Sequence, residues 1–149
     1  MGKGKSTMLS SNNIGNTSEC RNAITDCSRV RILLCDFNAE SCGQVLQLLT
    51  QCSYQVAPVT STAQMFDALE SEDPCMDIIL TEIAILIANG SSIMSSIKQN
   101  VSLRHTSVIM MVTNEEVSLI GKGLGYGAAD YLVKPLSIHE IKNLRIHIK

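Results

Sequence analysis

The chain has 149 residues, a formal net charge of −2, 45% hydrophobic residues and 17% charged residues. This length suits one domain with a full core, and the composition is typical of a globular rather than a disordered protein. A charge so close to neutral, with scattered basic residues, argues against a nucleic-acid-binding surface. The most apolar window, residues 76–88, is far shorter than the ~20 residues of a membrane-spanning helix. These features exclude a membrane span and disfavour direct DNA binding.

The chain begins with a polar stretch, residues 1–28, which is rich in Ser, Asn, Thr and Gly and has no hydrophobic period. We expect it to be a flexible leader preceding a domain at 29–149. Its first residues, "MGKGKS", fit the myristoylation pattern, although the lysine after Gly2 fits poorly. The six cysteines form no CxxC pair and no apolar signal segment precedes them, so a reduced intracellular protein is favoured.

Short apolar runs then alternate with segments of helical period. We predict five strands, at 29–35, 54–59, 76–82, 107–113 and 130–134. Pro58 places the second strand at an edge of the sheet, because proline cannot donate a ladder hydrogen bond.

Helices are predicted after each strand. Asn38 can cap the first and Thr60 or Ser61 the second, which Pro74 would end. Residues 83–90 are expected to be an irregular loop before a weak helix at 91–100. Asn114 is expected to cap the fourth helix, "EEVSLIGKGLG", and the last helix should run from 137 to the end. The glycines of "GKGLGYGAAD" follow a helix, so they indicate a helix end and loop rather than a dinucleotide site.

Five strand–helix units predict an α/β fold with a parallel sheet covered by helices on both faces. Right-handed crossovers place all strand carboxyl ends along one edge, where such sheets bind ligands. In this sequence the strand ends carry an unusual set of side chains: Asp36 and Phe37 after the first strand, Glu82 after the third, Val112 and Thr113 after the fourth, and Lys134 after the fifth.

This set resembles the receiver domain of two-component response regulators over residues 29–149. The stretches "RVRILLCD", "CSYQV", "DIILTEI", "VIMM" and "GAADYLVKPL" are similar to the pseudo-receiver of plant pseudo-response regulators, the circadian-clock family, of the timing-of-expression type. The resemblance implies a flavodoxin-like (βα)5 fold with strand order 2-1-3-4-5.

In genuine receivers two acids after the first strand hold Mg²⁺, an Asp ending the third strand accepts a phosphoryl group, and a Ser/Thr and a Lys bind that group. By resemblance Asp36 is the first acid and Lys134 is intact. Phe37, Glu82 and Val112 stand in place of the second acid, the acceptor and the hydroxyl residue. Thr113 comes one residue late, on the opposite face of a regular strand.

These replacements predict a pocket that has lost phosphotransfer. Glu places its carboxylate about 1.5 Å farther out than Asp, and a misplacement of about 1 Å can cost on the order of 10²-fold in rate. Without a well-placed metal, phosphoryl transfer loses most of its charge stabilisation. We therefore expect no enzyme activity, no cofactor and no metal.

Three roles for Glu82 stay open. It can pair with Lys134 and hold the edge of the sheet in one conformation, it can be a solvated carboxylate without consequence, or it can imitate a phosphorylated aspartate. The missing hydroxyl at Val112 disfavours the last of these.

A fold without its chemistry can still present a surface. By resemblance the face formed by the fourth helix, fifth strand and fifth helix, with Tyr131 and Leu136, should bind other pseudo-response regulators or transcription factors. This implies a nuclear protein of circadian transcription that reaches DNA through a partner, and either a fragment or a truncated homologue. The alternative is a residual phosphorelay receiver that uses Asp36, Glu82 or Asp77 as acceptor of phosphate from a histidine phosphotransfer partner.

Overall fold

The computed structural model describes residues 30–71 and 76–148. The predicted leader, the myristoylation pattern and Pro74 lie outside these residues. Among the helices that are described, none is both long enough and apolar enough to cross a bilayer.

The described residues form a five-stranded parallel sheet. Its spatial order is β3-β2-β4-β5-β6, which is 2-1-3-4-5 in chain order and confirms the expected fold. Pro58 lies in β3 at one edge of the sheet, as predicted. The strands are β2 (Arg31–Cys35), β3 (Gln55–Val59), β4 (Ile78–Glu82), β5 (Ser107–Val112) and β6 (Asp130–Val133).

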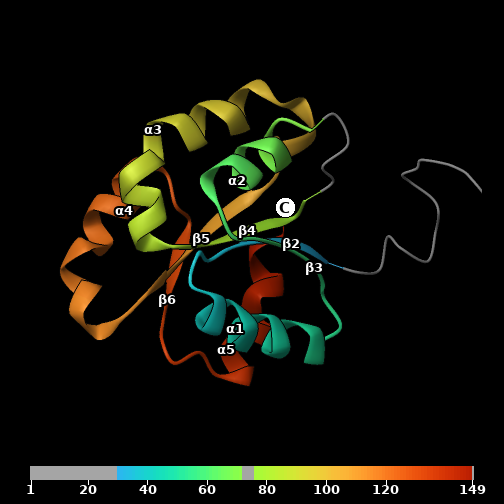
Figure 1. Ribbon diagram of the computed structural model, residues 1–149, viewed down its shortest axis with the longest axis vertical. Coiled ribbons are helices and arrows are strands. Elements are labelled where there is room, and N and C mark those ends of the chain that lie inside the picture. Colours follow the sequence, from blue (N-terminus) through green and yellow to red (C-terminus); the bar gives the residue numbers. More distant parts are fainter. Residues whose placement is uncertain (1–29, 72–75, 149) are drawn as a thin grey trace, which may run out of the picture. The chain divides into compact units, whose positions relative to one another are not determined.

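Helices cover both faces of the sheet (Figure 1). On one face lie α1 (Ala39–Gln51) and α5 (Ile138–Lys142); on the other lie α2 (Thr62–Leu69), α3 (Ile83–Gln99) and α4 (Ile120–Tyr126). Helix α1 buries an apolar stripe of Cys42, Val45 and Leu49, whereas α4 and α5 each bury one residue, Gly123 and Ile141. The alternation of strand side chains supplies both cores. Leu33 and Cys35 belong to a cluster with α2 and α3 residues, and Ile32 and Leu34, which alternate with them along β2, are equally buried.

Two predicted caps are confirmed. The side chain of Asn38 accepts a hydrogen bond from the N–H of Ser41, and that of Ser61 accepts one from the N–H of Gln64. Each satisfies a backbone donor that the first turn of its helix leaves free.

The predicted irregular loop at 83–90 is wrong. Helix α3 begins at Ile83, directly after β4, and contains the whole segment, with one non-helical residue at Asn89. The physical reason is a run without proline in which Ile83, Ile85 and Leu86 are buried at helical spacing. The strand therefore passes into the helix at Glu82 without an intervening loop.

The last two helices are shorter than predicted. A 3₁₀ turn, Asn114–Leu119, precedes α4, and its N-cap is Thr113 rather than Asn114. Gly127, at φ 119°, ends α4 in the left-handed conformation that glycine favours. The final helix changes after Lys142 to a 3₁₀ turn, Asn143–His147, which buries Leu144. In this final segment Ile141 and Leu144 are buried, whereas Ile138 is half-buried and Ile148 is exposed.

Candidate functional site

The carboxyl ends of the strands bring three predicted residues together. Cys35 of β2 is in register with Thr81 of β4, so Asp36 and Glu82, one residue later, end neighbouring strands. Lys134 follows β6, whose Val133 is in register with Val112 of β5. The sheet thus presents two carboxylates and one ammonium at the same edge.

Lys134 connects these strand ends through its side chain. Its Nζ atom lies 3.3 Å from Oδ2 of Asp36 and forms an ion pair with Oε2 of Glu82. The Asp36 side chain is only 1% exposed, and the Lys134 and Glu82 side chains are 18% and 21% exposed. The predicted Glu82–Lys134 pair is therefore present in the structure, and Asp36 shares the same cation.

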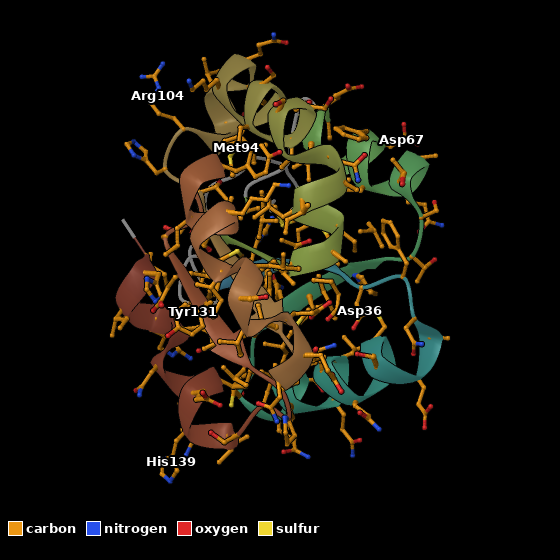
Figure 2. The ribbon with its side chains drawn as sticks, turned by 90° about the vertical axis from the view of Figure 1, so that its left-hand side faces the viewer. Asp36, Asp67, Met94, Arg104, Tyr131 and His139 are labelled. Carbon is orange, nitrogen blue, oxygen red and sulfur yellow. The ribbon has the colours of Figure 1, made fainter. Side chains whose placement is uncertain are left out.

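The first turn of α1 completes this cluster. The hydroxyl of Ser41 donates to Oδ2 of Asp36 at 2.5 Å and accepts from Nζ of Lys134 at 2.5 Å. The N–H of Asn38 donates to Oδ1 of Asp36 at 3.1 Å. Figure 2 shows Asp36 beside the start of this helix. Ser41 was missed at the level of sequence; the available signal was its place three residues after the cap Asn38, which turns it back toward the strand end.

The environment of Glu82 makes its charge costly. Burial is the main cause that raises the pKa of this carboxyl; contact with Lys134 lowers it, and the charges of Asp36 and Glu116 raise it further. Its Oε2 atom is buried and forms the ion pair with Lys134, but it accepts no hydrogen bond from the described residues. The net direction is a raised pKa, because desolvation outweighs one ammonium shared between two acids.

Val112 and Thr113 do not provide a hydroxyl in a receiver-like position. Val112 is fully buried and belongs to the hydrophobic cluster under α2 and α3. Thr113 begins the following 3₁₀ turn, and its N–H donates to Oε1 of Glu116 at 2.9 Å. The carbonyl of Val112 accepts from the N–H of Lys134 at 2.7 Å, which holds the backbone of the two strand ends together.

The remaining residues predicted for the site or for a binding face differ in position and exposure. Phe37 follows Asp36 and is 36% exposed. Tyr131 of β6 is 39% exposed, and Figure 2 places it beside α4 on the other side of the view from Asp36. Leu136 is half-buried. Asp77 does not join the cluster, because it precedes β4 and accepts from the N–H of Arg31 at the opposite ends of the strands.

The cysteines near the site have the character of core residues. Burial raises the pKa of the Cys35 thiol to about 12 and is also the main cause that raises the pKa of Cys42. Of the cysteines in the described part of the chain, Cys35, Cys42 and Cys52 are free thiols. A thiol with a raised pKa is a poor nucleophile at neutral pH.

A five-stranded parallel sheet in the order 2-1-3-4-5, with acids and a lysine at one edge, defines the class of receiver-type signalling domains. The chain belongs to the response regulator receiver domain family, whose family model matches residues 32–145.

Among its relatives are plant proteins named two-component response regulator-like. APRR1 of Arabidopsis thaliana is 48% identical over 132 residues, and PRR1 of Oryza sativa subsp. japonica is 44% identical over 123 residues. These matches cover 87% and 83% of this chain but 21% and 24% of the relatives, so the chain spans about a fifth to a quarter of their length. The resemblance to plant pseudo-response regulators is confirmed.

Solved receiver structures share the fold. The receiver domain of sensor histidine kinase PA1611 from Pseudomonas aeruginosa, which holds a magnesium ion in its active site cleft, has a TM-score of 0.65 at 23% identity and is covered to 93%, with 78% of this chain. The chemotaxis response regulator CheY4 of Vibrio cholerae has a TM-score of 0.64 at 18% identity and is covered to 99%, with 80% of this chain.

The fold thus implies a divalent metal, and the residues present do not fit one. Mg²⁺ requires near-octahedral oxygen ligands. Here both oxygens of Asp36 already accept hydrogen bonds, Glu82 is paired with Lys134, and Phe37 offers no oxygen. Among the described residues no group of three or more His, Cys, Asp or Glu side chains could hold a metal ion.

Proposed function

We propose that this domain is a non-phosphorylatable pseudo-receiver that acts as a protein–protein interaction module in transcriptional and circadian regulation. The observation that carries the proposal is the engagement of Lys134 with both carboxylates of the edge. Its ammonium is paired with side chains of this chain, one of them the glutamate at the position of the acceptor Asp.

The acceptor position supports the same conclusion. Glu82 is one methylene longer than the Asp of genuine receivers, and a misplaced group loses much of a positioned reaction. Its neighbour Val112 packs in the core and has no hydroxyl with which to bind a phosphoryl oxygen. Charge stabilisation supplies a large part of the catalysis of phosphoryl transfer. Here it would lack both the metal and the hydroxyl donor.

The surface available to a partner lies on α4 and β6. Four large apolar side chains are exposed there or in the preceding 3₁₀ turn: Val117, Leu119, Leu124 and Tyr131. Tyrosine is among the residue types that commonly contribute most of the binding energy of an interface, whereas Val and Leu rarely do, so Tyr131 is the proposed anchor of this surface. The partners we propose are other pseudo-response regulators or transcription factors, with the nucleus as the place of action and DNA reached through the partner.

The chemical half of the proposal is tested with a labelled small phosphodonor. The purified chain is incubated with acetyl phosphate and Mg²⁺ beside a receiver with a complete acidic pocket. We expect label on the complete receiver and none on this chain.

The alternative function, a phosphorelay receiver, is favoured by the presence of Asp36 and Glu82 at one edge. Hydroxylamine-sensitive label on this chain that disappears in Glu82→Gln or Asp36→Asn would overturn the proposal in its favour.

The interaction half is tested with a matched pair of surface variants. Tyr131→Ala and Phe37→Ala each remove one aromatic ring of nearly equal exposure, 39% and 36%, from different places. Binding to the receiver part of the Arabidopsis relative is measured by analytical ultracentrifugation. We expect Tyr131→Ala to weaken binding at least about tenfold, by roughly 1.4 kcal/mol or more, and Phe37→Ala to leave it unchanged. Equal affinity of both variants and the parent chain would contradict the proposed face.

A further inference from the structure

The ammonium of Lys134 contacts oxygen atoms from three parts of the fold. They belong to Asp36 after β2, Glu82 at the end of β4 and Ser41 in the first turn of α1. An ammonium has three N–H donors and no acceptor. Two of these contacts are hydrogen bonds, to Asp36 and Ser41, and the contact with Glu82 is an ion pair. Polar side chains of this edge therefore engage the ammonium on three sides.

The same oxygens are those a divalent ion would need. Asp36 and Glu82 are the carboxylates at this edge that Lys134 contacts, and Mg²⁺ sites in proteins commonly use one or two carboxylates plus water. Oδ1 of Asp36 is held by the N–H of Asn38, and Oδ2 is shared by Ser41 and Lys134. A dication entering between the carboxylates would meet the positive charge of Lys134 at close range, where like charges repel strongly in a partly buried site.

We propose that Lys134 is the resident cation of this edge: its ammonium occupies the space between Asp36 and Glu82, excludes divalent metal, and makes the fold of the domain independent of it. Removing the charge of Lys134 leaves two carboxylates without a counter-ion at neighbouring strand ends. Such a pair attracts a divalent cation, so the lysine conceals a metal site that one substitution opens. The inference concerns metal alone and does not depend on the proposed interaction function.

The test uses the full chain and Mn²⁺ as the probe, in isothermal titration and in thermal unfolding with Mn²⁺ or with EDTA. For the parent chain we expect no saturable heat of binding and the same Tm in both conditions. Lys134→Gln, which keeps a polar side chain but removes the charge, should bind Mn²⁺ saturably. Its Tm should rise by about 4 °C at a roughly tenfold excess of Mn²⁺ over Kd.

The double variant Lys134→Gln/Glu82→Gln is the matched control, because it lacks both the lysine and one proposed ligand. It should lose the Mn²⁺ response. Saturable Mn²⁺ binding by the parent chain that is lost in Glu82→Gln would overturn the proposal, and so would a folded Lys134→Gln variant without Mn²⁺ binding. The first of these outcomes needs no substitution at Lys134, so the proposal can be refuted even where Lys134→Gln does not fold. Neither measurement involves a phosphodonor or a protein partner, so its failure is distinguishable from failure of the proposed function.

Discussion

Nζ of Lys134 lies 3.3 Å from Oδ2 of Asp36, although 98 positions separate them in the chain. The contact reaches from the end of β6 to the end of β2, and the chain order 2-1-3-4-5 places β4 and β5 between these two strands. Glu82 at the end of β4 lies on this path and shares the ammonium. One side chain thus ties three strand ends together, and its charge offsets two acids whose burial would otherwise be unfavourable.

Replacing Lys134 with Met should destabilise the fold. The substitution leaves Asp36, almost fully buried, and Glu82 without their shared cation. The loss should be about 2–3 kcal/mol in the free energy of unfolding, between the values for exposed and fully buried pairs, because Asn38 and Ser41 still donate to Asp36. Urea denaturation at neutral pH measures it.

The matched control is Lys122→Met, which removes an exposed lysine from α4. Its effect should stay within about 0.5 kcal/mol. If Lys134→Met unfolds at the same urea concentration as the parent chain and as the control, the cluster at the sheet edge has no stabilising role.

The raised pKa of Glu82 predicts how stability changes with pH. Because the folded-state pKa lies above the ordinary 4.5, the folded protein binds more protons than the unfolded chain between these two values. The contribution of this carboxyl is therefore full below pH 4.5 and falls as the pH rises through the folded-state pKa. Gln at this position does not titrate. The free energy of unfolding of the parent chain minus that of Glu82→Gln should decrease between about pH 4 and pH 7, in urea titrations at several pH values. An increase over this range would mean that attraction by Lys134 outweighs desolvation, and that the pKa is lowered.

Much of the fold could be predicted from the sequence because its strands are contiguous apolar runs. Ile32, Leu33 and Leu34 are all buried, as both faces of a helix-covered parallel sheet require. Asn38 and Ser61 indicated the starts of their helices, because their side chains can accept hydrogen bonds from free backbone N–H groups. The pairing of Glu82 with Lys134 could also be predicted, because parallel strands deliver their last residues to one edge.

The remaining features depend on tertiary packing as well as on local pattern. The extent of α3 was missed because the tertiary burial of Ile83, Ile85 and Leu86 outweighed the serine- and glycine-rich stretch that follows. Ser41 was missed because its role arises from the angle at which α1 leaves Asp36. The short α5 reflects a final segment whose Leu144 is buried from a 3₁₀ turn rather than from an α-helix.

Gly90 provides a test of the contact between α3 and α4. A Cβ atom at this position would lie 2.6 Å from Cδ1 of Tyr126 and 2.7 Å from Cγ of the same ring, closer than side chains approach one another. Gly90→Ala should therefore destabilise the domain by about 1–3 kcal/mol, as overpacking does elsewhere. Thermal and urea unfolding measure the loss.

Gly43 offers the opposite result with the same substitution. It lies within α1, and a Cβ atom there would have no other heavy atom within 4 Å. Gly43→Ala should stabilise the domain by about 0.5–1 kcal/mol, because alanine loses less backbone freedom in a helix. Similar effects of the two substitutions would show that Tyr126 does not pack tightly on Gly90.

The hydroxyl of Tyr54 joins the start of β3 to the last helix. It donates to the carbonyl of Ile141 at 2.7 Å, and the residue is 4% exposed. The guanidinium carbon of Arg145 lies 5.1 Å from the centre of its ring. Tyr54→Phe keeps the ring and removes the donor, so a buried carbonyl at the end of α5 loses its side-chain partner. The free energy of unfolding should fall by about 1–2 kcal/mol.

Tyr131→Phe is the matched control, because this tyrosine is 39% exposed and its hydroxyl can be hydrated. Its effect should stay within about 0.5 kcal/mol. Amide hydrogen exchange distinguishes a local from a global effect: protection should fall first in α5 and the 3₁₀ turn that follows, since Tyr54 holds the carbonyls of Ile141 and Lys142. Unchanged exchange in these residues, with unchanged stability, would mean that the packing of Ile141 and Leu144 alone holds the last helix on the sheet.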